Sequence, residues 1–344
     1  MKALIIEDVR KCSVQEVADP TLTDDGVIVK IKANGICRSD WHIWSGDIPI
    51  TQSIIGHEFT GVVEEVGSSI RNFKKGDRVA VPFTGSDGTC PMCQQGHSNL
   101  CDHRTSPGNT FQGGYAEYTM VPNADRNLIH LPEEISFTEG AAIGCRLMTA
   151  FHGVTNRGQV KPGEWVVVYG CGGVGLSAIN IASSIGALVI GVDINDNNLR
   201  LAKEMGAHYT INSKEQNPVK AIMELTKGGA HVSIDALGID ETTVNSVLSL
   251  RKRGRHVQIG VTTKEEGGHV KLPVDLIVGK ELAFFGSFGM PSHQIPSIFP
   301  LIIGGKISPG KMVTGEVALK DVNDVFENMS NFTNNGTFVV TKFE

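Results

Sequence analysis

The stretch that decides the fold is "EWVVVYGCGGVGLSA", residues 164–178. It begins as a short apolar run, which is typical of a buried strand, and continues through a glycine-rich turn into a run of small and apolar residues. A second apolar run, "LVIGVDI" (188–194), ends close to Asp193. A strand, a G-x-G-x-x-G turn, a helix and a second strand that ends in an acidic residue predict a dinucleotide-binding βαβ unit.

Each glycine of this turn has a physical role in such a unit. Gly170 allows the tight turn, Gly172 lets the backbone approach a pyrophosphate, and Gly175 lets the helix pack closely on the strand. Asp193 should accept hydrogen bonds from ribose hydroxyls and repel a 2′-phosphate, and no arginine follows before Arg200, so NAD is favoured over NADP. A glycine-rich turn without a ligand is the alternative interpretation. The predicted coenzyme-binding turn comprises Gly170, Gly172, Gly173, Val174 and Gly175.

The remaining chain divides into two kinds of pattern. Up to about residue 130, short β-branched runs such as "GVIVKIKANGI" (26–36) alternate with turn residues and predict an antiparallel, barrel-like region. From Ser136, which forms a capping-box pattern with Glu139, helical and strand patterns alternate and predict parallel βαβ units. We therefore expect an α/β protein in which a parallel-sheet domain (147–287) is inserted in a β-rich domain (1–146 and 288–344).

Composition excludes several classes of protein. A net charge of −6 gives no basic surface for nucleic acid, and no apolar run reaches the roughly 18 residues that span a membrane. The start, "MKALIIEDVRKC", does not resemble a signal peptide. Seven cysteines in 344 residues then indicate metal-binding or catalytic thiols in a reducing compartment, so we expect a cytoplasmic protein.

Three residues far apart in the sequence form a candidate metal site. Cys37 lies in "GICRSDWH", His57 in "GHEFTG" and Cys145 in "AAIGCRLMTA". Each alone would more often be a packed core residue. Together, two thiolates and a neutral imidazole bind Zn²⁺ without net charge and leave a fourth position open, as a catalytic zinc requires.

These motifs, taken in order, resemble the zinc-dependent medium-chain alcohol dehydrogenase family over essentially the whole chain. The markers are C-R-S-D-x-H, G-H-E, a cysteine-rich loop, a cysteine in a later helix, and G-x-G-G-V-G. The resemblance implies a GroES-like domain that holds zinc, a Rossmann domain that holds the coenzyme, and an active site in the cleft between them. It also implies reversible hydride transfer between an alcohol or carbonyl substrate and NAD(H), with zinc as the Lewis acid.

The resemblance further implies a role for individual residues. Cys37, His57 and Cys145 would bind the catalytic zinc, Asp40 would orient His57, and Glu58 would lie behind the metal. Ser39 would contact the alcohol oxygen, and His42 would pass its proton to solvent through the coenzyme ribose. The coenzyme would also contact Arg38 through its pyrophosphate and Thr149 through its nicotinamide. Ile48 and Phe83 would line the substrate pocket, although simple core packing explains these two equally well.

The loop "SDGTCPMCQQGHSNLC" (86–101) departs from the family pattern. Family members carry four cysteines spaced C-x-x-C-x-x-C-x₇-C, whereas this loop has three and places an aspartate at the first position. Because a carboxylate is a permitted zinc ligand, we expect a second, structural zinc held by Asp87, Cys90, Cys93 and Cys101, with an empty loop as the alternative. A second departure is Thr337, where some members have an arginine that reaches the coenzyme phosphate.

Several functions compete with an alcohol dehydrogenase. A polyol or amino-alcohol dehydrogenase of the same fold often replaces the third sulfur ligand by glutamate, and a quinone or enone reductase lacks the Cys/His/Cys set. A zinc-ribbon binding module would need basic residues that the loop lacks, and a structural NAD-binding protein would not need an open zinc position. The expected partners are a small alcohol, aldehyde or ketone and other copies of the chain, as a tetramer rather than a dimer.

Overall fold

The computed structural model describes residues 1–331 and 333–343 of the chain, which divides into two compact units. The β-rich unit comprises Met1–Met148, Gly289–Gly305 and Pro309–Glu344, and the parallel-sheet unit comprises Thr149–Phe288 and Lys306–Ser308. Residues 332 and 344, which the predicted β-rich domain includes, lie outside the described residues. Among the helices described, none is both long enough and apolar enough to cross a membrane.

The β-rich unit is built on one long strand. β3 (Val27–Ile36) pairs antiparallel with β4, β6 and β15 and lies at the centre of a seven-stranded sheet. Six of these strands follow the order β14-β15-β3-β4-β5-β7, and the seventh, β6, pairs with β3 outside this order. β1 and β2 form a separate hairpin. Alternating and fully buried positions along β3 explain why it takes this central place. The other strands are β1 (Lys2–Asp8), β2 (Lys11–Glu16), β4 (Glu58–Val66), β5 (Arg78–Ala80), β6 (Tyr118–Val121), β7 (Ile129–His130), β14 (Val313–Ala318) and β15 (Thr337–Lys342).

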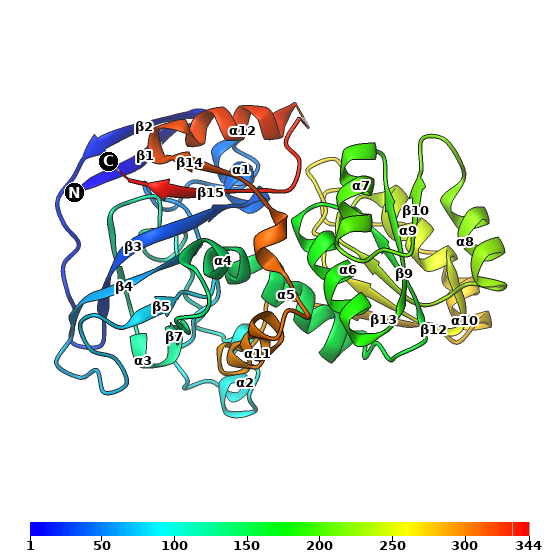
Figure 1. The fold of residues 1–344 in the computed structure, drawn as a ribbon, viewed down its shortest axis with the longest axis horizontal. Coiled ribbons are helices and arrows are strands. Elements are labelled where there is room, and N and C mark those ends of the chain that lie inside the picture. Colours follow the sequence, from blue (N-terminus) through cyan, green and yellow to red (C-terminus); the bar gives the residue numbers. More distant parts are fainter. Residues whose placement is uncertain (332, 344) are drawn as a thin grey trace. The chain divides into compact units, whose positions relative to one another are not determined.

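Short helices lie around this sheet and are labelled in Figure 1. They are α1 (Arg38–Trp44), α2 (Pro91–Gln94), α3 (Ala124–Asn127), α4 (Phe137–Ala142), α11 (Phe299–Ile303) and α12 (Val322–Ser330). The core beneath them contains large aromatic side chains that are fully buried, among them Trp44, Phe59, Tyr115 and Phe326. Trp44 of α1 and Phe326 of α12 lie 5.4 Å apart by ring centroids, which fixes these two helices against one another.

The parallel-sheet unit contains the predicted βαβ arrangement. Six strands, all paired in parallel, follow the order β10-β9-β8-β11-β12-β13, which is the 3-2-1-4-5-6 order of a Rossmann fold and confirms the predicted sheet. The strands are β8 (Trp165–Tyr169), β9 (Leu188–Asp193), β10 (Tyr209–Asn212), β11 (Ala230–Asp235), β12 (Leu250–Gln258) and β13 (Ala283–Gly286). The helices are α6 (Gly173–Ile185), α7 (Asp196–Glu204), α8 (Pro218–Thr226), α9 (Asp240–Leu248) and α10 (Val274–Gly279).

Helix boundaries follow local sequence signals, with one exception. The Ser136 and Glu139 capping box begins α4, as predicted. Asn217 caps α8 ahead of Pro218, which is a favourable first residue of a helix. The exception is the helix expected after Ser136, which is not a continuous α-helix. It widens into π-helix at Ile143–Leu147, returns to α-helix in α5 (Met148–Phe151), and widens again at His152–Arg157.

The glycine turn between β8 and α6 has geometry that other residues would not reproduce. Gly170 has a φ of 86°, in the left-handed region that favours glycine. A Cβ atom on Gly175 would lie 1.7 Å from the Gly170 carbonyl oxygen, whereas a Cβ atom on Gly172 would meet nothing within 4 Å. Gly175 is therefore required for packing, while Gly172 borders open space at the start of α6.

The different roles of Gly175 and Gly172 can be tested by replacing each with alanine and comparing thermal stability. Gly175→Ala should lower the free energy of unfolding by roughly 1–3 kcal/mol, because the added methyl group must push α6 away from the turn. Gly172→Ala, the matched control, should leave thermal stability close to that of the wild type. Equal melting temperatures for Gly175→Ala and the wild type would contradict the close packing at this turn.

Candidate active site

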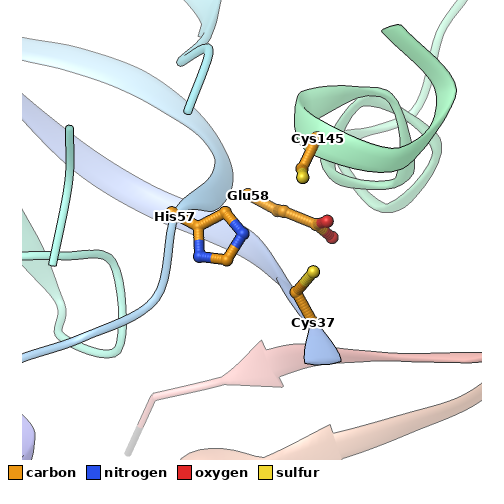
Figure 2. Close-up of side chains that lie close together, drawn as sticks. All are labelled: Cys37, His57, Glu58 and Cys145. Atoms are coloured by element: carbon orange, nitrogen blue, oxygen red, sulfur yellow. The ribbon is translucent and has the colours of Figure 1, made fainter. Parts of the chain in front are cut away.

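Four potential metal ligands from three separate segments converge in the β-rich unit. Cys37 follows β3 and precedes α1, His57 and Glu58 lie at the start of β4, and Cys145 lies in the first π-helical turn. Their donor atoms all lie within 4.8 Å of one another, and Figure 2 shows the four side chains directed toward a common space. The predicted Cys37, His57 and Cys145 set is thus brought together, and Glu58 joins it.

Asp40 fixes the histidine of this set. Its Oδ1 atom lies 2.7 Å from His57 Nδ1, which leaves Nε2 of the ring free to bind a metal. Its Oδ2 atom accepts hydrogen bonds from the Tyr115 hydroxyl at 2.8 Å and from the Cys37 backbone N–H at 3.2 Å. Burial would lower the pKa of His57, but the negative charges of Asp40 and Cys37 outweigh burial and raise it well above its ordinary value.

The two thiols of the set influence one another. A hydrogen bond from Cys145 lowers the pKa of Cys37 well below its ordinary value, and the same contact together with burial raises the pKa of Cys145. One thiol therefore ionises readily while the other retains its proton. Because zinc binds thiolates, loading this site must release protons and should weaken in acid.

Glu58 forms a buried ion pair with Arg146, a residue that the sequence analysis did not single out. Arg146 Nε donates to Glu58 Oε1 at 3.1 Å, and Nη2 donates to Oε2, so that both carboxylate oxygens are engaged. Burial raises the pKa of Glu58, and the positive charge of the Arg146 guanidinium, which contacts both carboxylate oxygens, opposes this rise. The carboxylate thus depends on Arg146 to remain ionised in this environment.

Helix α1 carries the other predicted catalytic side chains. The Ser39 hydroxyl lies 3.8 Å from Cys37 Sγ, next to the ligand set. His42 Nδ1 lies 2.8 Å from Asp47 Oδ2, which holds the ring in one orientation. The Arg38 guanidinium stacks on the Trp41 ring at 3.7 Å and donates to the Met329 carbonyl at 2.8 Å, so α1 is tied to α12 through this side chain.

The two predicted pocket residues lie in different environments. The Phe83 ring lies 6.1 Å from the His57 ring, at an edge-to-face angle of 67°, and so borders the ligand set. Ile48 lies in the turn after α1, where its backbone N–H donates to the His42 carbonyl, and its side chain is 43% exposed. Core packing therefore does not account for Ile48.

In the parallel-sheet unit, Asp193 ends β9 beside the glycine turn. Its carboxylate accepts hydrogen bonds from the backbone N–H groups of Cys171 at 2.7 Å and Asn195 at 2.9 Å. The side-chain amide of Asn198 approaches it at 3.4 Å. Thr149 is the first residue of this unit, and its hydroxyl is buried with no hydrogen-bond partner among the described residues.

The cysteine loop forms a second group of potential metal ligands. The sulfur atoms of Cys90, Cys93 and Cys101 lie within 4.8 Å of one another, and Cys90 and Cys93 are 3.6 Å apart. Asp87 is outside this mutual group, but its Oδ1 atom lies 3.4 Å from Cys101 Sγ. Backbone N–H groups of Asp102 and Cys93 lower the pKa of Cys90 to about 7, which favours the thiolate that a metal needs.

Comparison with known proteins assigns the family. Residues 23–133 match the alcohol dehydrogenase GroES-like domain, and residues 173–303 match the zinc-binding dehydrogenase domain. An alcohol dehydrogenase of Geobacillus stearothermophilus is 33% identical, over 99% of this chain and 99% of its own length. The chain belongs to the zinc-type medium-chain alcohol dehydrogenase family.

Further relatives agree with this family assignment. A D-arabitol-phosphate dehydrogenase of Enterococcus avium is 31% identical, over 91% of this chain and 89% of its own length. The solved structure of the alcohol dehydrogenase TADH from Thermus sp. ATN1 superimposes with a TM-score of 0.93 at 30% identity, and the match covers 99% of this chain and 100% of that one. The chain is therefore an oxidoreductase with a GroES-like and a Rossmann-type fold, as predicted.

Two residues at the ligand set were missed by the family motifs. Tyr115 lies far from Asp40 in sequence, and nothing local marks it as a partner of a buried carboxylate. Arg146 did carry a signal, because it is the one charged residue in the apolar segment "AAIGCRLMTA". A charge in such a segment requires a buried partner, and the acidic Glu58 of the G-H-E motif was available.

Proposed function

We propose that this protein is a zinc- and NAD-dependent alcohol dehydrogenase, which interconverts an alcohol with an aldehyde or ketone. The observation that carries the proposal is the convergence of Cys37, His57 and Cys145 around one space, with His57 oriented by Asp40. Two thiols and an imidazole suit zinc, and three protein ligands leave a position for substrate. When bound, zinc would supply Lewis acidity and NAD would accept the hydride.

Side chains of helix α1 would carry away the proton of the substrate hydroxyl. Ser39, beside Cys37, would accept the proton of the substrate hydroxyl at its Oγ atom and pass it toward His42. Asp47 accepts from His42 Nδ1 in this arrangement, so Nε2 would be the atom that receives the proton. Phe83, which borders His57, would form one wall of the substrate pocket, and the exposed Ile48 side chain would lie at another.

NAD is the proposed coenzyme because the Rossmann turn fits a dinucleotide. Gly172 borders open space at the start of α6, where a pyrophosphate would be held by backbone N–H groups within the turn Gly170–Gly175. Asp193 adds a negative charge at the end of β9, which disfavours a 2′-phosphate. The buried Thr149 hydroxyl, which has no hydrogen-bond partner among the described residues, would supply a polar contact for the nicotinamide. Arg38 would supply a positive charge for the pyrophosphate.

A polyol or polyol phosphate is the second candidate substrate. The similarity to a D-arabitol-phosphate dehydrogenase supports it. The sulfur ligand Cys145, rather than a glutamate, supports a simple alcohol instead.

The proposal is tested by offering primary, secondary and aromatic alcohols, sorbitol and arabitol phosphate with NAD⁺ or NADP⁺ and following absorbance of the reduced coenzyme. We expect turnover with at least one simple alcohol and a higher kcat/KM with NAD⁺. Cys37→Ala should lose zinc and turnover together because a thiolate ligand is removed, while Cys12→Ala, which lies outside the ligand set, should retain both. A folded Cys37→Ala variant that lacks zinc but turns over normally would contradict the mechanism.

We also propose a structural zinc in the cysteine loop. Zinc–sulfur and zinc–oxygen bond lengths place two tetrahedral sulfur ligands about 3.8 Å apart and a sulfur and an oxygen ligand about 3.6 Å apart. The Cys90 Sγ–Cys93 Sγ distance of 3.6 Å and the Cys101 Sγ–Asp87 Oδ1 distance of 3.4 Å are close to these values.

Both proposed zinc sites need reduced thiols, which supports a reducing compartment such as the cytoplasm.

Zinc content distinguishes the two states of the loop. We expect about two zinc ions per subunit, and Asp87→Ala should lower this toward one and reduce thermal stability, because the second site loses a ligand. Asp102→Ala, a neighbouring acidic residue outside the ligand set, should retain both ions. One zinc per wild-type subunit, with three reactive loop thiols, would refute the structural site.

Finally, we propose that the protein forms a homo-oligomer, with a tetramer expected. β13 ends the parallel sheet, and its Phe284 side chain is 41% exposed, while Val274 and Val278 of α10, which precedes it in the chain, are 62% and 71% exposed. A second copy of the chain would cover these apolar side chains. Val278→Asp should lower the mass measured by sedimentation, because it places a charge in this surface. Val9→Asp, at an exposed position of the other unit, should not. A monomeric wild type at all micromolar concentrations would contradict the proposal.

A further inference from the structure

We propose that Arg146 is a positioning residue that holds the Glu58 carboxylate away from the metal and so keeps the fourth coordination position open. The inference rests on the proposed zinc site, and it concerns which group occupies the position that substrate would use. It assigns a function to an ion pair that could otherwise be regarded as part of the folded core.

The Glu58 carboxylate lies at the candidate metal site and is paired with Arg146. One of its oxygen atoms belongs to the same mutual group as the donor atoms of Cys37, His57 and Cys145, and Figure 2 shows the carboxylate between the two sulfur atoms. A metal bound by those three residues would therefore have Glu58 within reach as a fourth ligand. The guanidinium of Arg146 instead takes both carboxylate oxygens in a fork. A carboxylate held in this way must break a bidentate contact before it can bind the metal.

The surrounding chain leaves space for this ion pair and little space for alternatives. A Cβ atom on Gly35 would lie 2.2 Å from Glu58 Oε2 and 2.9 Å from Arg146 Nη2. A Cβ atom on Gly144 would lie 3.1 Å from the Glu58 Cα atom, so the helix that carries Arg146 packs directly on β4. The side chains of Arg146 and Glu58 are 8% and 0% exposed, which leaves almost no water to screen the pair.

A π-helical turn carries two consecutive residues of this site, Cys145 and Arg146. On a regular α-helix, Cys145 and Arg146 would point about 100° apart, since 3.6 residues complete each turn. The turn at Ile143–Leu147 is wider, and within it Cys145 belongs to the ligand group while the guanidinium of Arg146 contacts Glu58. Such widened turns occur often at functional sites, where they redirect a side chain.

Charge balance shows why the fork matters. Two thiolates neutralise one zinc ion, which makes Glu58 a surplus buried negative charge that Arg146 compensates. Without Arg146, the carboxylate would have to take up a proton or bind the metal. We expect metal binding, because a Glu58 oxygen already lies within the group of donor atoms that would surround a metal. A fourth protein ligand would convert an open site into a closed one.

The test replaces zinc by cobalt(II), whose visible spectrum reports the ligands, and titrates imidazole as a probe of the open position. The wild type should bind imidazole with a clear spectral change. In Arg146→Gln, imidazole affinity should fall roughly 10-fold and transfer of zinc to a chelating dye should slow by a similar factor, as expected for a change beside the ligands. Glu58→Gln should bind imidazole as the wild type does, and the double variant Arg146→Gln/Glu58→Gln should recover that affinity, because the competing carboxylate is gone.

A purely structural ion pair would behave differently. It would lower the melting temperature of Arg146→Gln while imidazole affinity and zinc transfer stayed at wild-type values, and that result would overturn the proposal. If Arg146→Gln does not fold, Arg146→Lys keeps the charge but loses the fork, and an intermediate loss of imidazole affinity is then expected; unchanged affinity would overturn the proposal. A wild type that binds no cobalt here would overturn the proposed function as well, whereas a metal-loaded, alcohol-oxidising wild type with unaffected variants would overturn this inference alone.

Discussion

The Asp40 carboxylate is the contact on which the geometry of the candidate active site depends. It accepts hydrogen bonds from the His57 ring, the Tyr115 hydroxyl and the Cys37 backbone, which belong to three different segments of the β-rich unit. Asp40 is fully buried, so each lost partner would leave an unsatisfied charge in a dry environment. This constraint fixes the histidine ring, the start of α1 and the first cysteine ligand relative to one another, whether or not a metal is bound.

A buried site of this kind requires its charges to be paired in advance. Asp40 pairs with His57, and Glu58 pairs with Arg146, so two acidic and two basic side chains lie among apolar core residues. Such pairs contribute little net stability, because desolvation offsets most of the attraction, but removing one partner costs several kcal/mol. The arrangement therefore contributes specificity of position more than stability, which suits a site that must hold ligands ready for a metal.

Sequence patterns predicted the parts of this protein that depend on local rules. The glycine turn between β8 and α6, the capping box at Ser136, the Asn217 cap and the parallel strands follow from spacing and residue type, and the structure has them. The convergence of Cys37, His57 and Cys145 is not local, and it was predicted from the residue types and the family resemblance, because spacing alone does not show which distant residues meet. The π-helical turns and the Tyr115 contact could not be predicted, because they arise from packing between segments far apart in sequence. Arg146 was predictable in principle, since a lone arginine in an apolar segment demands a buried acid.

The two groups of thiols show how burial determines which ligand substitutions a metal site tolerates. At the candidate catalytic site, His57 and Glu58 are each bonded to a charged side chain, so a change at either residue leaves a buried charge without its partner. The cysteine loop is more open, and Asp87 there receives its own hydrogen bonds from Thr89 and His103. Those contacts lower the pKa of Asp87 and keep it ionised, led by the Thr89 backbone N–H. An aspartate in this loop thus brings its own stabilising donors and remains partly hydrated, whereas an additional carboxylate at the buried site needs an arginine of its own.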